Sequence, residues 1–183
     1  MNLIELIFST DFLYMWIRVA TPILLASLGA VICTKAGVVN LGLEGIMLIS
    51  ALAGVLGSAF GGSLWIGLLT GLLASVAVSA VFAYFHLVLK ANNVLCGTAV
   101  NTMASGLTVF VLQLATGEKG NSSSLKSFSF PNVDIPIIKD IPVLGGILSG
   151  HNALTYLALA MVVVIWFFLY KTPTGLRMRA VGE

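Results

Sequence analysis

Residues 35–45 read KAGVVNLGLEG, a polar and glycine-broken link between two apolar runs, 19–34 and 46–60. Backbone of this kind is tolerated within or near the hydrocarbon region only where it is buried in protein or lines a water-filled cavity. Glu44 is notable because an unpaired carboxylate costs several kcal/mol to bury in an apolar environment. Two interpretations stay open: Glu44 is functional, or it is a charge at a helix start that Asn40 caps.

The composition indicates an integral membrane protein. Hydrophobic residues make up 58% of the 183 residues and charged residues 9%, against about 25% charged residues in a soluble domain. No Asp, Glu, Lys or Arg occurs between Gly45 and Leu89, a run long enough for two membrane spans. The apolar residues run continuously and do not alternate, which argues against a β-barrel. We therefore expect an all-α, polytopic helical membrane protein with about five transmembrane helices.

The spans follow from the apolar runs and the turns between them. We expect spans at about 12–34, 43–60, 64–89, 94–115 and 152–170, with a long loop at 117–150 and a charged segment at 171–183. Residues 1–16 either begin the first span or lie at the interface. The third span carries a small residue at every fourth position, which predicts close packing against another helix. These residues are Gly67, Gly71, Ser75, Ser79 and Ala83.

The fourth span differs from the others because polar side chains follow one side of it. They lie within about 140° of one another on a helical wheel, and they are Thr98, Asn101, Thr102, Ser105, Thr108 and Gln113. A single hydroxyl in a membrane helix usually bonds the backbone one turn back. Six polar residues on one side favour a helix that faces a solute pathway, and helix–helix association is the alternative.

The basic residues predict the orientation. Five of them lie in short turns or in the last segment: Lys35, Lys90, Lys171, Arg177 and Arg179. The bases of the 117–150 loop are balanced by acids. The positive-inside rule then places the C-terminus in the cytoplasm, and the 117–150 loop and the N-terminus outside.

Several functions are not expected. The bases are too scattered for nucleic-acid binding. Because the phosphate-binding pattern GxxxxGK[ST] is missing, we do not expect the chain to hydrolyse ATP itself. Cys33 and Cys96 are interpreted as small buried hydrophobes, and no metal site or bound cofactor is expected. Glu5 and Asp11 stand where a signal peptide has its basic residues, so we expect no cleaved signal.

Four segments carry a resemblance to a known family: TPILLASLG at 21–29, AGVVNLGLEG at 36–45, CGTAVN at 96–101 and TGLRMRAVGE at 174–183. Together they resemble the inner-membrane permeases of ABC importers, in the branched-chain amino acid, sugar and nucleoside permease family. The second segment is most similar to the nucleoside branch, which takes up guanosine and other purine nucleosides. Family members continue beyond the last segment, so residues 1–183 look like the N-terminal half of one permease domain.

The resemblance implies a permease subunit, not an enzyme, of an ATP-driven importer that moves nucleosides across the bacterial plasma membrane. It implies as partners separate ATPase subunits, a second permease subunit and an extracytoplasmic substrate-binding lipoprotein. A sugar or branched-chain amino acid permease, or a non-transporting membrane scaffold, are the alternatives. The residues expected beside the substrate pathway are Asn40, Gly42, Glu44, Thr98, Asn101, Thr102 and Ser105. The residues expected to couple to the ATPase are Thr174, Gly175, Leu176, Arg177, Arg179 and Glu183.

Overall fold

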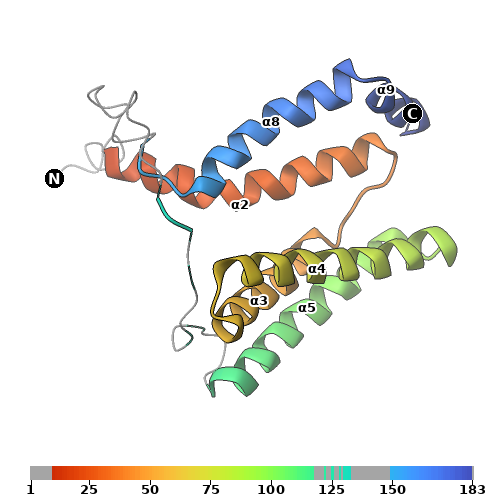
Figure 1. Cartoon of the computed structure of the whole chain (residues 1–183). Coiled ribbons are helices and arrows are strands. Elements are labelled where there is room, and N and C mark those ends of the chain that lie inside the picture. The colour runs from red at the N-terminus through yellow and green to blue at the C-terminus, as the bar shows by residue number, and fades with distance from the viewer. Residues whose placement is uncertain are drawn as a thin grey trace, which may run out of the picture. The chain divides into compact units, whose positions relative to one another are not determined.

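The computed structural model describes residues 10–117, 122, 125, 128, 130–132 and 149–182. Its helices are α2 (Thr10–Lys35), α3 (Leu43–Gly61), α4 (Leu64–Ala83), the π-helix η1 (Tyr84–Val88), α5 (Asn93–Thr116), α8 (Ala153–Lys171) and α9 (Pro173–Gly182) (Figure 1). Most of the 117–150 loop and Glu183 lie outside the described residues.

Five helical stretches are long and apolar enough to cross a membrane. They are Phe12–Lys35, Leu43–Gly61, Leu64–Val88, Asn93–Thr116 and Ala153–Lys171. The predicted all-α fold with about five transmembrane helices is confirmed. The last helix, α9, has 10 residues and is far shorter than the roughly 20 residues that a membrane span needs.

The chain divides into two compact units, Val39–Ser129 on the one hand and Met1–Val38 with Phe130–Glu183 on the other. The first of these is a hairpin of α3 and α4 with α5 packed on α3. Within the hairpin, Thr70 donates a hydrogen bond to the carbonyl oxygen of Ala53 at 3.0 Å. A Cβ added at Gly67 would lie 2.6 Å from Ser58 Cβ, so the predicted close packing along α4 occurs at this part of the small-residue ridge.

The end of the third span differs from the expected α-helix. The last turn forms the π-helix η1, in which the Leu89 N–H bonds the Tyr84 carbonyl at 3.3 Å, five residues back. This wider turn stops the helix, and Lys90 then adopts a positive φ of 50°. The chain enters α5 with Asn92 as the N-cap, its side chain accepting from Val94 N at 2.9 Å.

In the other unit α2 and α8 run side by side in the same direction (Figure 1). Near their first residues, Tyr14 donates to the Gly150 carbonyl at 2.8 Å and stacks on His151 with ring centroids 4.1 Å apart. Near their last residues, α9 contacts both helices. Three spans separate α2 from α8 in the sequence, so a five-span chain requires these two to cross in the same direction, as they do.

Candidate functional site

The turn before α3 is held first by its own asparagine. Asn40 Oδ1 accepts a hydrogen bond from Gly42 N at 3.0 Å, which forms a local turn of the kind that Asn favours. Helix α3 begins at Leu43 with Gly42 as its N-cap. Glycine has no side chain that could bond the first turn of the helix. The interpretation of Asn40 as the N-cap is therefore wrong: Asn40 shapes the turn one step earlier.

The same turn is held from α5 by the amide of Asn101. Asn101 Nδ2 donates to the Leu41 carbonyl at 3.0 Å, and Asn101 Oδ1 accepts from Gly45 N at 2.8 Å. Gly45 is the third residue of α3, whose N–H has no partner within the helix. The amide from α5 thus supplies the cap that the sequence of α3 lacks.

Two further residues of α5 extend this contact. Asn93 donates from Nδ2 to the Val39 carbonyl, and a Cβ added at Gly97 would lie 2.6 Å from Leu41 Cβ. Residues spaced by four lie on one face of a helix, so Asn93, Gly97 and Asn101 form a single track. We call these three residues the amide track. Asn93 and Gly97 are not among the residues predicted from the sequence, although their spacing of four and eight residues from Asn101 is a signal that could identify them.

The amide track explains why a polar break is tolerated between two apolar spans. The Val39 and Leu41 carbonyls and the Gly45 N–H all bond side-chain amides from α5. Polar backbone groups that protein amides bond in this way do not carry the cost of being unpaired in hydrocarbon. The turn is thereby fixed to α5.

The predicted polar stripe of α5 divides into two parts. Thr98, Thr102 and Ser105 are exposed in this chain, whereas Thr108 is buried and Asn101 is half-buried. The exposed hydroxyls donate to carbonyls of their own helix at 2.9 to 3.1 Å. Their oxygen lone pairs remain as acceptors, so this exposed strip offers a solute acceptors more readily than donors.

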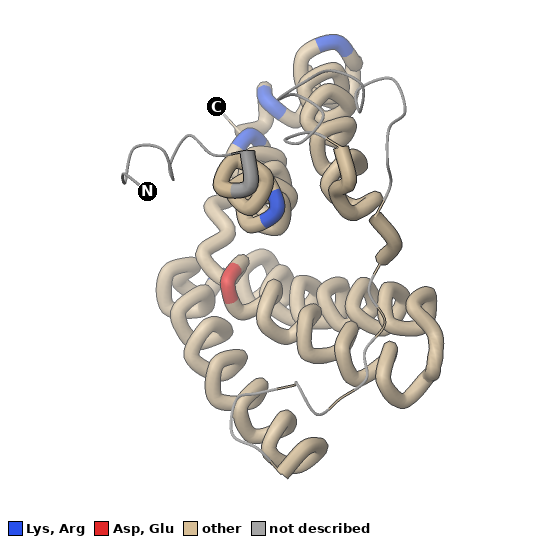
Figure 2. Tube along the Cα trace, turned by 90° about the vertical axis from the view of Figure 1, so that its left-hand side faces the viewer, with Lys and Arg blue, Asp and Glu red and all other residues tan. Residues whose placement is uncertain are grey.

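Glu44 lies in the first turn of α3 and is exposed. It is the only acid between Phe12 and Gly117, and Figure 2 shows how few charged residues the described helices carry. A carboxylate in this position interacts favourably with the positive end of the helix dipole. Four of the residues predicted to line the pathway therefore lie together: Glu44 stands in the helical turn that follows Gly42, and Asn40 and Asn101 bond the backbone around it.

Helix α9 has a cap of its own. Gly175 N donates to Thr172 Oγ1 at 3.2 Å, and Leu176 N donates to the Thr172 carbonyl at 3.1 Å. Pro173 occupies the first helical position, where its missing N–H has no cost. The hydroxyl of Thr174 lies 3.0 Å from that of Thr172. Thr172 is therefore the cap of α9.

The two arginines of α9 have different surroundings. Arg177 is exposed, and so are the apolar Leu176 (53%) and Val181 (83%). Arg179 is half-buried, with its guanidinium carbon 4.8 Å from the centroid of the Tyr170 ring. Arg177 is thus available to a partner, whereas Arg179 ties α9 to α8. Glu183, the remaining predicted coupling residue, lies outside the described residues.

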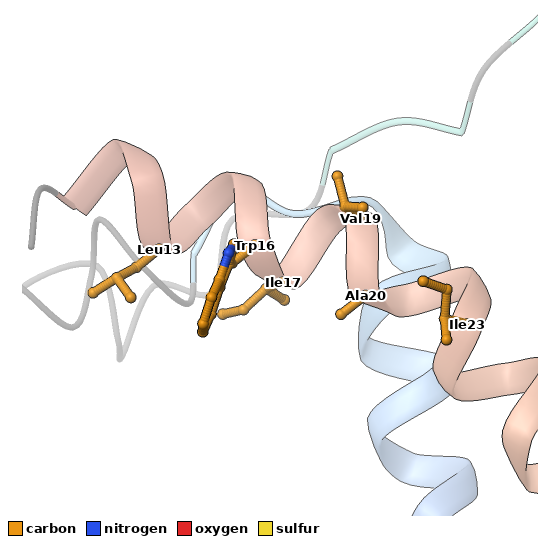
Figure 3. A pocket seen from close by; sticks show the side chains of 6 residues that line it. All are labelled: Leu13, Trp16, Ile17, Val19, Ala20 and Ile23. Atoms are coloured by element: carbon orange, nitrogen blue, oxygen red, sulfur yellow. The ribbon is translucent and has the colours of Figure 1, made fainter. Parts of the chain in front are cut away.

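An apolar hollow on α2 is a poor candidate for a solute site. Its lining comes from one helix only: Leu13, Trp16, Ile17, Val19, Ala20 and Ile23 (Figure 3). The indole N–H of Trp16 is the one side-chain polar group among these six residues. Such a surface suits hydrocarbon. Among the described residues, no three His, Cys, Asp or Glu side chains come together as a metal site.

The five apolar helices, the polar turn that α5 holds by hydrogen bonds and the short helix after the last span define a multi-pass membrane protein with polar groups bonded between two of its spans. The sequence profile described as "Branched-chain amino acid transport system / permease component" matches residues 12–183. The chain belongs to this family.

Three relatives show the range of the family near this chain. A guanosine ABC transporter permease protein of Bacillus subtilis is 38% identical over 90% of this chain and 53% of its own length. A nucleoside ABC transporter permease protein of Lactococcus lactis is 33% identical over 100% of this chain and 57% of its own length. A putative glucose ABC transporter permease protein of Haloferax volcanii is 37% identical over 96% of this chain and 53% of its own length.

The chain therefore spans about half the length of the curated relatives it matches. No solved structure matches it.

Proposed function

We propose that the chain is the N-terminal part of the permease domain of an ATP-driven ABC importer, which moves nucleosides across the bacterial plasma membrane. The observation that carries this proposal is helix α9. It is a capped helix directly after a span, and it presents Leu176, Arg177 and Val181 outward. Exposed apolar side chains beside an exposed arginine suit docking to a protein partner. We assign that partner as the ATPase subunit, which hydrolyses ATP on a separate chain.

The orientation that this function needs is supported by the charges at one end of the unit that contains α2, α8 and α9. Because α2 and α8 run parallel, Lys35 and Lys171 end their helices on the same side, next to α9 with its two arginines. The positive-inside rule makes this side cytoplasmic. The 117–150 loop then lies outside, where an extracytoplasmic binding protein delivers the solute.

The pathway residues take two roles in this proposal. Glu44 and the exposed strip of α5, Thr98, Thr102 and Ser105, contact the solute. Asn40, Gly42 and Asn101 hold the turn that presents Glu44. A second permease subunit and the remainder of the permease complete the pathway, and the chain itself binds no cofactor.

A nucleoside is the substrate that we favour, because two of the relatives are named as guanosine and nucleoside permeases. The relative named as a putative glucose permease makes a sugar the second candidate. Both are uncharged and rich in hydroxyl donors, which suits the acceptors of the α5 strip. Uptake of labelled guanosine and of labelled glucose by the assembled transporter decides between them.

Replacement of Arg177 by Glu tests the docking assignment in the assembled transporter. We expect Arg177→Glu to abolish co-purification of the ATPase and to leave membrane insertion intact, because the new charge repels what the arginine attracted. Lys90→Glu is the matched control, since it reverses a charge in the turn between α4 and α5. If the ATPase still co-purifies with Arg177→Glu at the wild-type level, the coupling assignment of α9 is wrong.

A further inference from the structure

Helix α9 rests on its neighbours through two glycines. A Cβ added at Gly175 would lie 2.2 Å from the Phe168 carbonyl oxygen and 2.7 Å from Leu169 Cα, both in α8. A Cβ added at Gly182 would lie 2.3 Å from the Lys35 carbonyl oxygen at the end of α2. The two glycines are seven residues apart, about two helical turns, so both lie on the same face of α9. One face of α9 thus contacts the backbone of both α8 and α2.

The end of α2 that receives Gly182 is itself fixed. Gly37 has a φ of +83°, and its N–H bonds the Thr34 carbonyl at 3.1 Å, while the Val38 N–H bonds the Cys33 carbonyl at 3.0 Å. This is the Schellman arrangement that ends many helices. The contact is mutual, because a Cβ added at Gly37 would lie 3.1 Å from Gly182 Cα.

A crowded contact between two backbones is relieved in a different way from a crowded contact between side chains. A crowded side chain changes its rotamer, whereas helical backbone moves only with its helix. A methyl group at Gly182 therefore has to lift the end of α9 off α2. The ring contact between Arg179 and Tyr170 ties the middle of α9 to α8 as well.

We propose that Gly37, Gly175 and Gly182 are positioning residues that lock α9 to the ends of α2 and α8, so that these three helices move as one body when the ATPase displaces α9. The inference rests on the proposed function, in which α9 receives the force. It adds a route for that force: Gly37 stands two residues before Val39, the first residue of the turn that the amide track holds. The lock therefore connects the docking helix, through the backbone, to the predicted solute pathway.

Distances in the assembled transporter test the lock directly. Spin labels are placed at the exposed Val19 on α2 and the exposed Ala180 on α9, in a background where Cys33 and Cys96 are replaced by Ala, after checking that the labelled protein still co-purifies with the ATPase. Pulsed electron paramagnetic resonance is recorded without nucleotide and with ATP trapped. We expect one narrow distance distribution that is the same in both states. A distance that changes between the states overturns the proposal.

Gly182→Ala tests the consequence for transport, with Gly29→Ala as its matched control. A Cβ at Gly29 meets nothing within 4 Å, so the same methyl group is added to α2 without a clash. We expect Gly182→Ala to keep its ATPase bound but to lower uptake per assembled transporter at least tenfold, and Gly29→Ala to transport like the wild type.

Two results for Gly182→Ala overturn the lock. Wild-type uptake would mean that the backbone contact is not needed. If Gly182→Ala lost both co-purification of the ATPase and uptake, Gly182 would belong to the surface that docks the ATPase and would not transmit the movement of α9. Failure of the proposed function is recognised separately, because the unsubstituted transporter would then not co-purify with an ATPase at all. If Gly182→Ala fails to insert into the membrane, the distance measurement still tests the lock, because it is made on protein that keeps all three glycines.

Discussion

Asn101 and Gly45 are 56 residues apart in sequence, and the amide oxygen of Asn101 accepts from the Gly45 N–H at 2.8 Å. The first turn of α3 is therefore capped from another span. The same amide donates to the Leu41 carbonyl, so one side chain closes both ends of a five-residue turn. A polar break that would be unstable on its own becomes a fixed part of the α3–α5 pair.

Asn101→Leu removes both hydrogen bonds at nearly constant volume. We expect it to lower the free energy of unfolding by about 1–3 kcal/mol, since two hydrogen bonds are lost and two backbone groups are left without partners. Denaturation in detergent, followed by tryptophan fluorescence, measures the difference.

Thr102→Val is the control for Asn101, because the exposed Thr102 hydroxyl bonds only the carbonyl of Thr98 in its own helix. Its stability should stay within about 0.5 kcal/mol of the wild type, as for most surface substitutions. Equal losses for Thr102→Val and Asn101→Leu would show that the cap contributes nothing particular.

The helices could be predicted from the sequence because bilayer thickness fixes how long an apolar run has to be. The role of Asn101 could not. An amide on a membrane helix has the same periodicity whether it faces a solute or a neighbouring backbone, and only the register between α3 and α5 decides. The register places Asn101 opposite the Gly45 N–H, while Thr98 and Ser105 stay exposed.

The two arginines of α9 illustrate the same limit. They are two residues apart in one short charged helix, and the sequence treats them alike. Successive residues of a helix point about 100° apart, so Arg177 and Arg179 differ by about 200° in direction. Only the fold shows that Tyr170 stands on the side of Arg179, which leaves Arg177 for a partner.

The α3–α4 hairpin should be sensitive to a single methyl group. A Cβ added at Gly57 would lie 1.9 Å from Thr70 Oγ1, and this hydroxyl bonds the Ala53 carbonyl across the interface. We expect Gly57→Ala to destabilise the protein by about 1–3 kcal/mol, as overpacking does in cores. Gly106→Ala, where nothing lies within 4 Å, should be neutral or slightly stabilising. Thermal unfolding of the two variants in detergent compares them, and equal midpoints would contradict the packing argument.

Glu44→Gln separates a pathway role from a helix-end role. Loss of the dipole interaction alone lowers stability by about 0.3–1 kcal/mol and leaves uptake per molecule unchanged. If Glu44 accepts hydrogen bonds from the solute, we expect uptake per molecule to fall at least fivefold while the amount of protein in the membrane stays the same. Glu44→Asp, which keeps the charge in the first turn, should retain more uptake than Glu44→Gln. Unchanged uptake for Glu44→Gln would leave Glu44 as a helix-end charge.

Cysteine accessibility along the exposed strip of α5 tests whether this side of the span lines a water-filled pathway or packs against other protein. Cysteines at Thr98, Thr102 and Ser105 should react with membrane-impermeant thiol reagents in the assembled transporter, because a thiol needs water to form its reactive thiolate. Leu107 points to the opposite side of the same helix, about 180° from Thr98, so a cysteine there should stay unreactive. Substrate added before the reagent should slow the reaction at the strip and leave other positions unaffected. If all four cysteines are unreactive, the hydroxyls serve helix association, as in a non-transporting scaffold, because a pathway that admits a nucleoside also admits a reagent of similar size.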